Sequence, residues 1–325
     1  MKIRVARALI QVALSPLIFA ACNDSTGPRS GLAWSIVPSG TVNELDALWG
    51  TSASNVWAVG DETILHYDGA TWSTVAGGSG SGLSGIWLFG IWGSSASNIW
   101  AVGYETGGTP AILHYDGASW SSVPSPSTTQ LYYTSVSGSS ASDVWAAGPS
   151  GFISHYDGTS WSNVPSAANQ VLTAVWASSS SDAWAVGIDG MFHYDGTSWA
   201  PVTGTSGEFL SVFGTSQSDV WAVGQGSGGP SHYDGTSWSD GPRESAFPDY
   251  ALGVWASSRT DVWAVGVDTV SAGFVSKIAH YNGTTWSDVG MGKSSAILVG
   301  AWGSSATDVW VVGDGGTILH GTPTR

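Results

Sequence analysis

Short apolar runs alternate with polar turns along most of this chain. The runs are about four to six residues long, rich in Val, Ile and Trp and bounded by Gly, Ser and Asp, a pattern typical of β-strands. They come in groups of four, and in the first group we expect strands over 47–49, 55–59, 63–67 and 70–75. After residue 21 no long helical period interrupts the pattern, so the sequence predicts an all-β protein.

The group of four strands repeats along the chain, and a core of the type V-W-A-V-G marks the second strand of each copy. Its tryptophan recurs at intervals of 37 to 47 residues, which is the span of one four-stranded propeller blade. The seven positions are Trp57, Trp100, Trp145, Trp184, Trp221, Trp263 and Trp310. An unbroken array of seven copies predicts one domain, a seven-bladed β-propeller over 32–325.

The seventh copy lacks a fourth strand, because it stops at 318–321. The sequence W-S-I-V-P-S at 34–39 matches the fourth strands W-S-S-V-P-S at 120–125 and W-S-N-V-P-S at 161–166. We therefore expect an N-terminal strand to complete the last blade and close the ring, which leaves only short exposed edges.

One position in the first strand is small in every copy, as expected where innermost strands crowd around a propeller axis. These residues are Ala47, Gly90, Ser135, Ala174, Ser211, Gly253 and Gly300. The large tryptophans of the second strands are expected to pack between neighbouring blades.

The turns divide the propeller into two faces. The turn between the first two strands and the Asp-Gly turn between the last two are nearly uniform, and Asp-Gly favours a type I′ hairpin. The other connections share the opposite face and vary in length, most of all at 77–88, 104–110, 240–250 and 267–277. Variable loops carry function more often than uniform ones, so we expect a binding site on this variable-loop face.

The N-terminus differs from the rest of the chain. Residues 1–21 have a basic start and an apolar run, which predicts an export signal peptide. Ala20 and Ala21 then precede the only cysteine, Cys22, and this arrangement resembles the lipobox of bacterial lipoproteins, which implies lipidation of Cys22, a tether over 22–31 and an outer-membrane or cell-surface location. The alternative is an ordinary cleaved signal followed by a chance cysteine.

The charge of the chain excludes one class of partner. Charged residues make up only 10% of the sequence and the formal net charge is −15; residues 1–21 contain three basic residues and no acid. The exported chain is therefore still more acidic, and a nucleic acid would be repelled.

The full repeat, S-x-S-D-V-W-A-V-G-x-x-G-x-I-x-H-Y-D-G-T-S-W, resembles the blades of bacterial surface propellers related to photosystem II assembly-factor-like and BNR (Asp-box) repeat proteins. More loosely, it is similar to tectonin-like lectins, which pair a V-W strand with a D-G-x-x-W hairpin. The resemblance covers 34–321 and implies a binding protein with a protein or glycan partner.

All seven histidines occupy one repeat position, so a propeller places them too far apart to converge on one metal ion. They are His66, His114, His155, His193, His232, His280 and His320. We expect each to hydrogen-bond the Asp or Asn that begins the second strand of its own copy, and we expect neither a metal nor a cofactor.

Enzymatic activity is not expected either. A sialidase-like glycoside hydrolase is an alternative because sialidases are propellers, and that resemblance would require three arginines on different blades. After residue 21 the chain offers only Arg29, Arg243, Arg259 and Arg325. No serine-nucleophile elbow or phosphate loop is present in the sequence.

The leading hypothesis is a lipid-anchored, monomeric propeller of the cell envelope that binds a protein or a glycan. The first candidate site combines two loops of the sixth copy, because they hold aromatic rings and charges of both signs. Its residues are Arg243, Glu244, Phe247, Tyr250, Phe274 and Lys277, and the second candidate is centred on Trp87 and Tyr104, with Phe89 and Glu105 nearby. The alternative is that Phe247 and Phe274 pack inwards.

Overall fold

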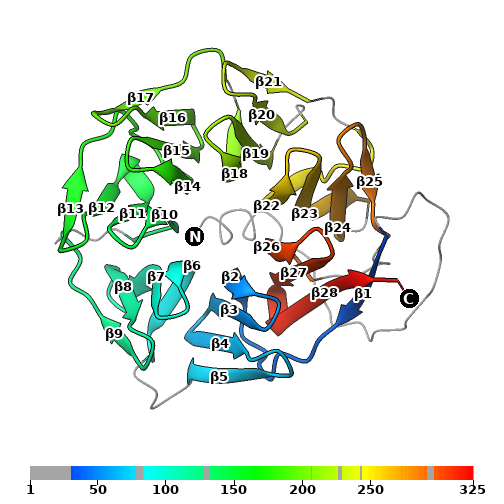
Figure 1. Ribbon diagram of the computed structural model, residues 1–325, viewed down its shortest axis with the longest axis horizontal. Helices are drawn as coiled ribbons and strands as arrows, with labels where there is room; N and C mark the ends of the chain where they lie inside the picture. Colours follow the sequence, from blue (N-terminus) through cyan, green and yellow to red (C-terminus); the bar gives the residue numbers. More distant parts are fainter. Residues whose placement is uncertain are drawn as a thin grey trace.

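Four-stranded antiparallel sheets form a closed ring in the computed structural model (Figure 1). The structure describes residues 31–77, 83–127, 132–205, 207–225, 229–241, 244–271, 273–290 and 296–324. Each sheet is one blade, with its first strand nearest the axis (Figure 1). The predicted all-β, seven-bladed propeller is confirmed.

The strands follow one another outwards in each blade. Blade one comprises β2 (Leu45–Ser52), β3 (Asn55–Gly60), β4 (Thr63–Tyr67) and β5 (Trp72–Gly77), and blade two β6 (Ile86–Ser95), β7 (Asn98–Glu105), β8 (Thr109–Tyr115) and β9 (Trp120–Ser122). Blade three comprises β10 (Ser135–Ser140), β11 (Asp143–Ala147), β12 (Ile153–Tyr156) and β13 (Trp161–Val164), and blade four β14 (Leu172–Ser179), β15 (Asp182–Gly187), β16 (Gly190–Tyr194) and β17 (Trp199–Pro201).

The remaining blades include the joined pair and the closing one. Blade five comprises β18 (Glu208–Ser216), β19 (Asp219–Gln225), β20 (Ser231–Tyr233) and β21 (Trp238–Asp240), and blade six β22 (Tyr250–Ser258), β23 (Asp261–Val270), β24 (Gly273–Tyr281) and β25 (Trp286–Asp288). A single pairing of Gln225 with Tyr250 links these two blades. Blade seven comprises β26 (Leu298–Ser305), β27 (Asp308–Gly313), β28 (Thr317–Pro323) and β1 (Leu32–Ile36).

The first strand of the chain closes the ring, as predicted. β1 pairs antiparallel with β28, with Trp34 opposite Gly321. The Trp34 ring then meets Trp263 of blade six edge-on, with centroids 5.5 Å apart. The last blade is therefore built from both ends of the chain (Figure 1).

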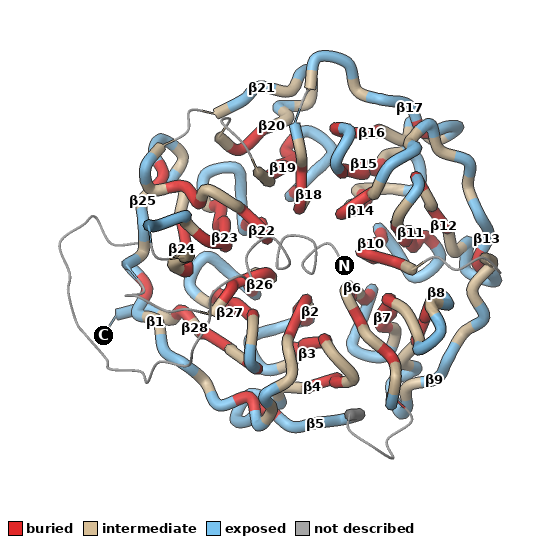
Figure 2. Tube along the Cα trace, turned by 180° about the vertical axis from the view of Figure 1, so that it is seen from behind, coloured by how far each residue is buried: buried red, intermediate tan, exposed pale blue. Residues whose placement is uncertain are grey.

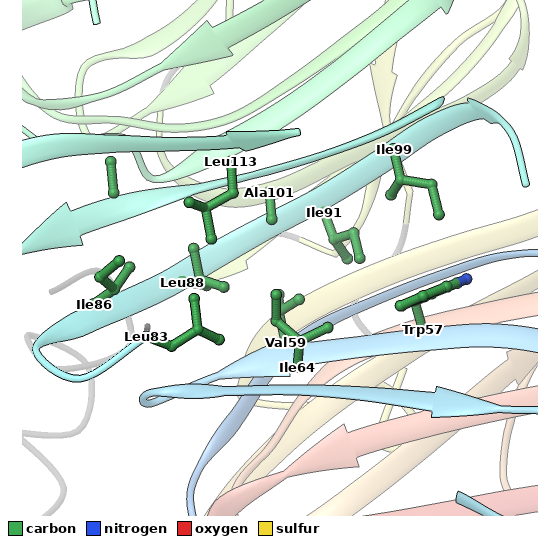
Figure 3. Packing of buried hydrophobic residues seen from close by; sticks show 11 residues of the cluster. Trp57, Val59, Ile64, Leu83, Ile86, Leu88, Ile91, Ile99, Ala101 and Leu113 are labelled. Carbon is green, nitrogen blue, oxygen red and sulfur yellow. The ribbon is translucent and has the colours of Figure 1, made fainter. Parts of the chain in front are cut away.

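The tryptophans of the second strands pack between blades, which confirms the prediction. Each is at most 5% exposed, and Trp57 shows the pattern: its ring lies 5.0 Å from Tyr115 and 5.8 Å from Trp120, both in blade two. Aliphatic residues of blades one and two face each other beside Trp57, among them Val59 and Leu88 (Figure 3). Exposed residues concentrate along the outermost strands and the turns (Figure 2).

Every histidine is held as expected. Its Nε2 lies 2.6 to 2.7 Å from an Oδ1 of the Asp or Asn that begins the second strand of its blade, and its ring packs on the tryptophan of that strand. The acceptors, in blade order, are Asn55, Asn98, Asp143, Asp182, Asp219, Asp261 and Asp308. The histidines thus fasten the third strand of each blade to the second.

Two local predictions were wrong. At the Asp-Gly turns only the glycine has a positive φ, 95° at Gly69, so the turn is not type I′. Instead Asp68 Oδ1 accepts hydrogen bonds from the backbone N–H groups of Ala70 and Thr71, both at 2.9 Å, which gives a longer turn stabilised by the Asp side chain. Much of the predicted loop 267–277 is an extended hairpin, paired out to Val270 and Gly273.

Among the described residues, no helix has the length and apolar character needed to cross a membrane. The same residues contain no group of three or more His, Cys, Asp or Glu side chains arranged to hold a metal ion.

Candidate functional site

The two loops of the first candidate site lie side by side, as predicted. The backbone N–H of Asp249, which precedes β22, donates to Asp268 Oδ1 in β23 at 3.0 Å, and the N–H of Thr269 donates to Asp249 Oδ2 at 2.9 Å. These bonds fasten the connection from blade five against the extended hairpin of blade six.

Two residues of that site are not presented to a ligand, which corrects the expectation. Phe247 is 4% exposed and meets Trp286 edge-on with centroids 5.0 Å apart, so it belongs to the core between blades five and six. Lys277 is 7% exposed, and its Nζ lies 2.6 Å from both Asp268 Oδ2 and the carbonyl oxygen of Ser245. Such a buried, paired ammonium holds the two loops together, because removing either partner leaves a charge without compensation.

The other described residues of the first candidate are partly accessible. Glu244 Oε2 accepts a hydrogen bond from the backbone N–H of Trp286 at 3.2 Å. Tyr250 and Phe274 are half-buried and meet edge-on at 6.3 Å, and Gln225 Nε2 donates to the Tyr250 hydroxyl at 3.3 Å. The predictions at Arg243 and Cys22 lie outside the described residues.

The second candidate is the larger aromatic surface. Trp87 and Tyr104 of blade two stack with centroids 4.8 Å apart and an interplanar angle of 9°. Phe89 lies 5.6 Å from Tyr104, and Tyr132, which enters blade three, lies 6.3 Å from both Phe89 and Tyr104. We call these four half-buried residues the aromatic cluster.

Strand register explains why these rings meet. Trp87 stands directly opposite Tyr104 in the β6–β7 ladder, so their side chains leave the sheet on the same face. Both stand where β6 begins and β7 ends, at the variable-loop face. Burial raises the pKa of the Tyr132 hydroxyl, which fits a ring enclosed by its neighbours.

The sequence already contained a signal for Tyr132 that was not used. Trp87, Tyr132 and Tyr250 each stand three residues before the small residue of their blade, at Gly90, Ser135 and Gly253. This repeat position therefore lies at the rim of the variable-loop face, and blades two and three, which are neighbours, both fill it with aromatic rings.

The aromatic cluster borders the axial channel. A cavity of about 160 Å³ occupies the axis, and all seven predicted small residues line it, together with Phe89 and Asp46. The expectation that small residues surround the axis is therefore confirmed. At Gly90 an added Cβ would lie 2.9 Å from the backbone N of Val136, so the inner strands could not approach so closely with a larger residue.

The arrangement is one of aromatic rings, backbone and few charges, which suits binding rather than proton transfer. The histidines, the most obvious candidates for acid–base chemistry, are each engaged within a blade. The structure thus defines a seven-bladed β-propeller with an aromatic surface at the rim of its channel.

Neither a family model nor a curated protein matches the chain. Solved structures do. YCF48 bound to D1 peptide is 18% identical with a TM-score of 0.68, covering 90% of this chain and 97% of that one. YCF48 from Cyanidioschyzon merolae is 16% identical with a TM-score of 0.66 (90% and 100%), and virginiamycin B lyase from Staphylococcus aureus is 10% identical with a TM-score of 0.72 (90% and 98%). At these identities the similarity establishes the propeller fold.

Proposed function

We propose that this protein is a binding propeller whose partner is another protein, held on the variable-loop face at the aromatic cluster. The observation that carries the proposal is the contact of four half-buried rings from two blades at the rim of the channel. Clustered Trp and Tyr side chains with an apolar body and a polar tip are the residues that contribute most to protein interfaces. The similar propeller YCF48 has been solved with a peptide bound, which supports a protein partner.

We also propose that the propeller is exported and attached to the membrane through a lipid on Cys22. The support is the basic and apolar segment 1–21 followed by Ala-Ala-Cys. Because β1 is the outermost strand of blade seven, a tether over 22–31 would join the ring at its outer edge.

The test of the binding function compares two double variants. Purified wild-type propeller is used to capture partners from detergent-solubilised cell envelope and is applied in parallel to a glycan array. The variant Trp87→Ala/Tyr104→Ala should lose the captured protein, whereas Tyr250→Ala/Phe274→Ala, which removes two half-buried rings from blade six, should retain it.

Circular dichroism and thermal unfolding of both variants establish that the fold is intact. Loss of binding in the blade-six variant alone would move the site to the first candidate. Specific glycan signals that depend on Trp87 and Tyr104 would favour a lectin instead, and capture unaffected by either variant would refute the proposal.

A further inference from the structure

A carboxylate stands beside the aromatic cluster. Asp61 forms an isolated antiparallel bridge with Trp87, and Trp87 in turn is opposite Tyr104. Residues directly opposite each other in antiparallel pairing project to the same face. Asp61, Trp87 and Tyr104 therefore form a cross-strand row of one acid and two stacked rings at the variable-loop face.

A second carboxylate lies at the channel. Asp46 and Phe89 both line the axial cavity, and Asp46 is the one charged residue among its described lining residues. The acid is 5% exposed. The aromatic cluster is thus bordered by Asp61 on its blade-one side and reaches, through Phe89, the channel that Asp46 lines.

No basic side chain of the described residues offsets these acids. Lys277 is paired with Asp268 in blade six. Arg259 lies in the uniform turn between β22 and β23, on the opposite face, where its guanidinium donates to the carbonyl oxygen of Ser218 at 2.8 Å. With a formal net charge of −15, the protein presents a negative potential to whatever approaches the cluster.

On the basis of the proposed function, we infer that the partner presents a basic, extended segment and that one Lys or Arg side chain of it binds over Trp87 and Tyr104 beside Asp61. Aromatic faces attract cations through the ring quadrupole, and a neighbouring carboxylate adds charge complementarity. An acidic or neutral segment gains neither interaction, so the site selects by charge.

The selectivity is tested by fluorescence anisotropy with three labelled Gly-Ser peptides that are identical except at every third position, where they carry Lys, Gln or Glu. The wild-type propeller should bind the lysine peptide more tightly than the glutamine peptide, and the glutamate peptide least. The preference should decline at higher salt concentration, since exposed charges are screened.

The variant Asp61→Asn preserves shape and removes the charge. It should reduce the preference for lysine over glutamine by about two- to fivefold, the range expected for one partly exposed ion pair. The matched control is Asp195→Asn in a uniform turn of blade four, which alters the net charge equally at a position where blade six itself has Asn282. This control should leave the preference unchanged.

Absence of a lysine preference in the wild type, whether the peptides bind equally or not at all, overturns the inference. So does an equal loss of preference in Asp61→Asn and Asp195→Asn, because that would reflect net charge rather than this site. Partner capture that depends on Trp87 and Tyr104 would stand in either case, so the two proposals fail separately. A preference for free spermidine that abolishes peptide binding without any dependence on Trp87 would also count against it.

Discussion

Ring closure by β1 is tested by replacing Trp34 with alanine. Trp34 is half-buried and meets Trp263 of the neighbouring blade at 5.5 Å and 63°. Trp120, the equivalent residue of an internal blade, is also half-buried and meets Trp57 at 5.8 Å and 73°. If β1 is as firmly held as an internal strand, Trp34→Ala and Trp120→Ala should destabilise the protein to the same extent.

The magnitude follows from the burial of the ring. Truncation of a fully buried Trp costs about 3–5 kcal/mol, and an edge-to-face contact is worth about 0.5–1.5 kcal/mol beyond its area. A half-buried ring that loses both terms in part should cost about 2–4 kcal/mol. In a protein of this size that corresponds to a fall in Tm of roughly 4–12 °C.

Thermal unfolding followed by near-ultraviolet circular dichroism measures this effect. An unchanged Tm for Trp34→Ala, together with a clear fall for Trp120→Ala, would show that β1 does not lock the ring in solution. Deletion of 31–41 provides the stronger perturbation, because it exposes the whole edge of β28, and it should lower the Tm further than Trp34→Ala does.

Two other predictions concern acid stability and anchoring. Burial lowers the pKa of His66 and of His114, the two histidines paired with Asn, so their contribution to stability is present above about pH 6.5 and lost as the pH falls through that range; the double variant Asn55→Asp/Asn98→Asp should show a smaller fall in Tm between about pH 7 and 5, and an identical fall would contradict this explanation. Replacing Cys22 with Ser should abolish acyl labelling and move the protein out of the membrane fraction; an intact mass of the wild type without acyl groups would refute the anchor.

The fold could be predicted from the sequence because its determinants repeat. The tryptophans of the second strands and the small residues around the axis recur once per blade, and even the displaced fourth strand at Trp34 keeps its motif. The Asp-Gly turn was misread for a physical reason. The motif identifies a turn, but not whether the Asp backbone adopts a positive φ or its side chain accepts the hydrogen bonds, as it does at Asp68.

The site was harder to predict because its residues lie where the repeat breaks down. In a non-repeating loop the sequence does not distinguish a ring that packs inwards, such as Phe247, from one that remains accessible, such as Tyr250. Tyr132 was missed because it lies in a connection. Only its spacing from Ser135 relates it to Trp87, and only the three-dimensional structure brings blade three against blade two.

The pairing of β1 with β28 also determines the connectivity of the molecule. Leu32 stands opposite Pro323, and the backbone N–H of Thr324 donates to the carbonyl oxygen of Gly31 at 3.1 Å. The two ends of the described chain thus meet within one sheet, and a short peptide linker could join them without disturbing any blade. The propeller is in this sense a circular polypeptide interrupted at one place, and new termini opened at a uniform turn would preserve every strand pairing while moving the membrane attachment point to a different blade.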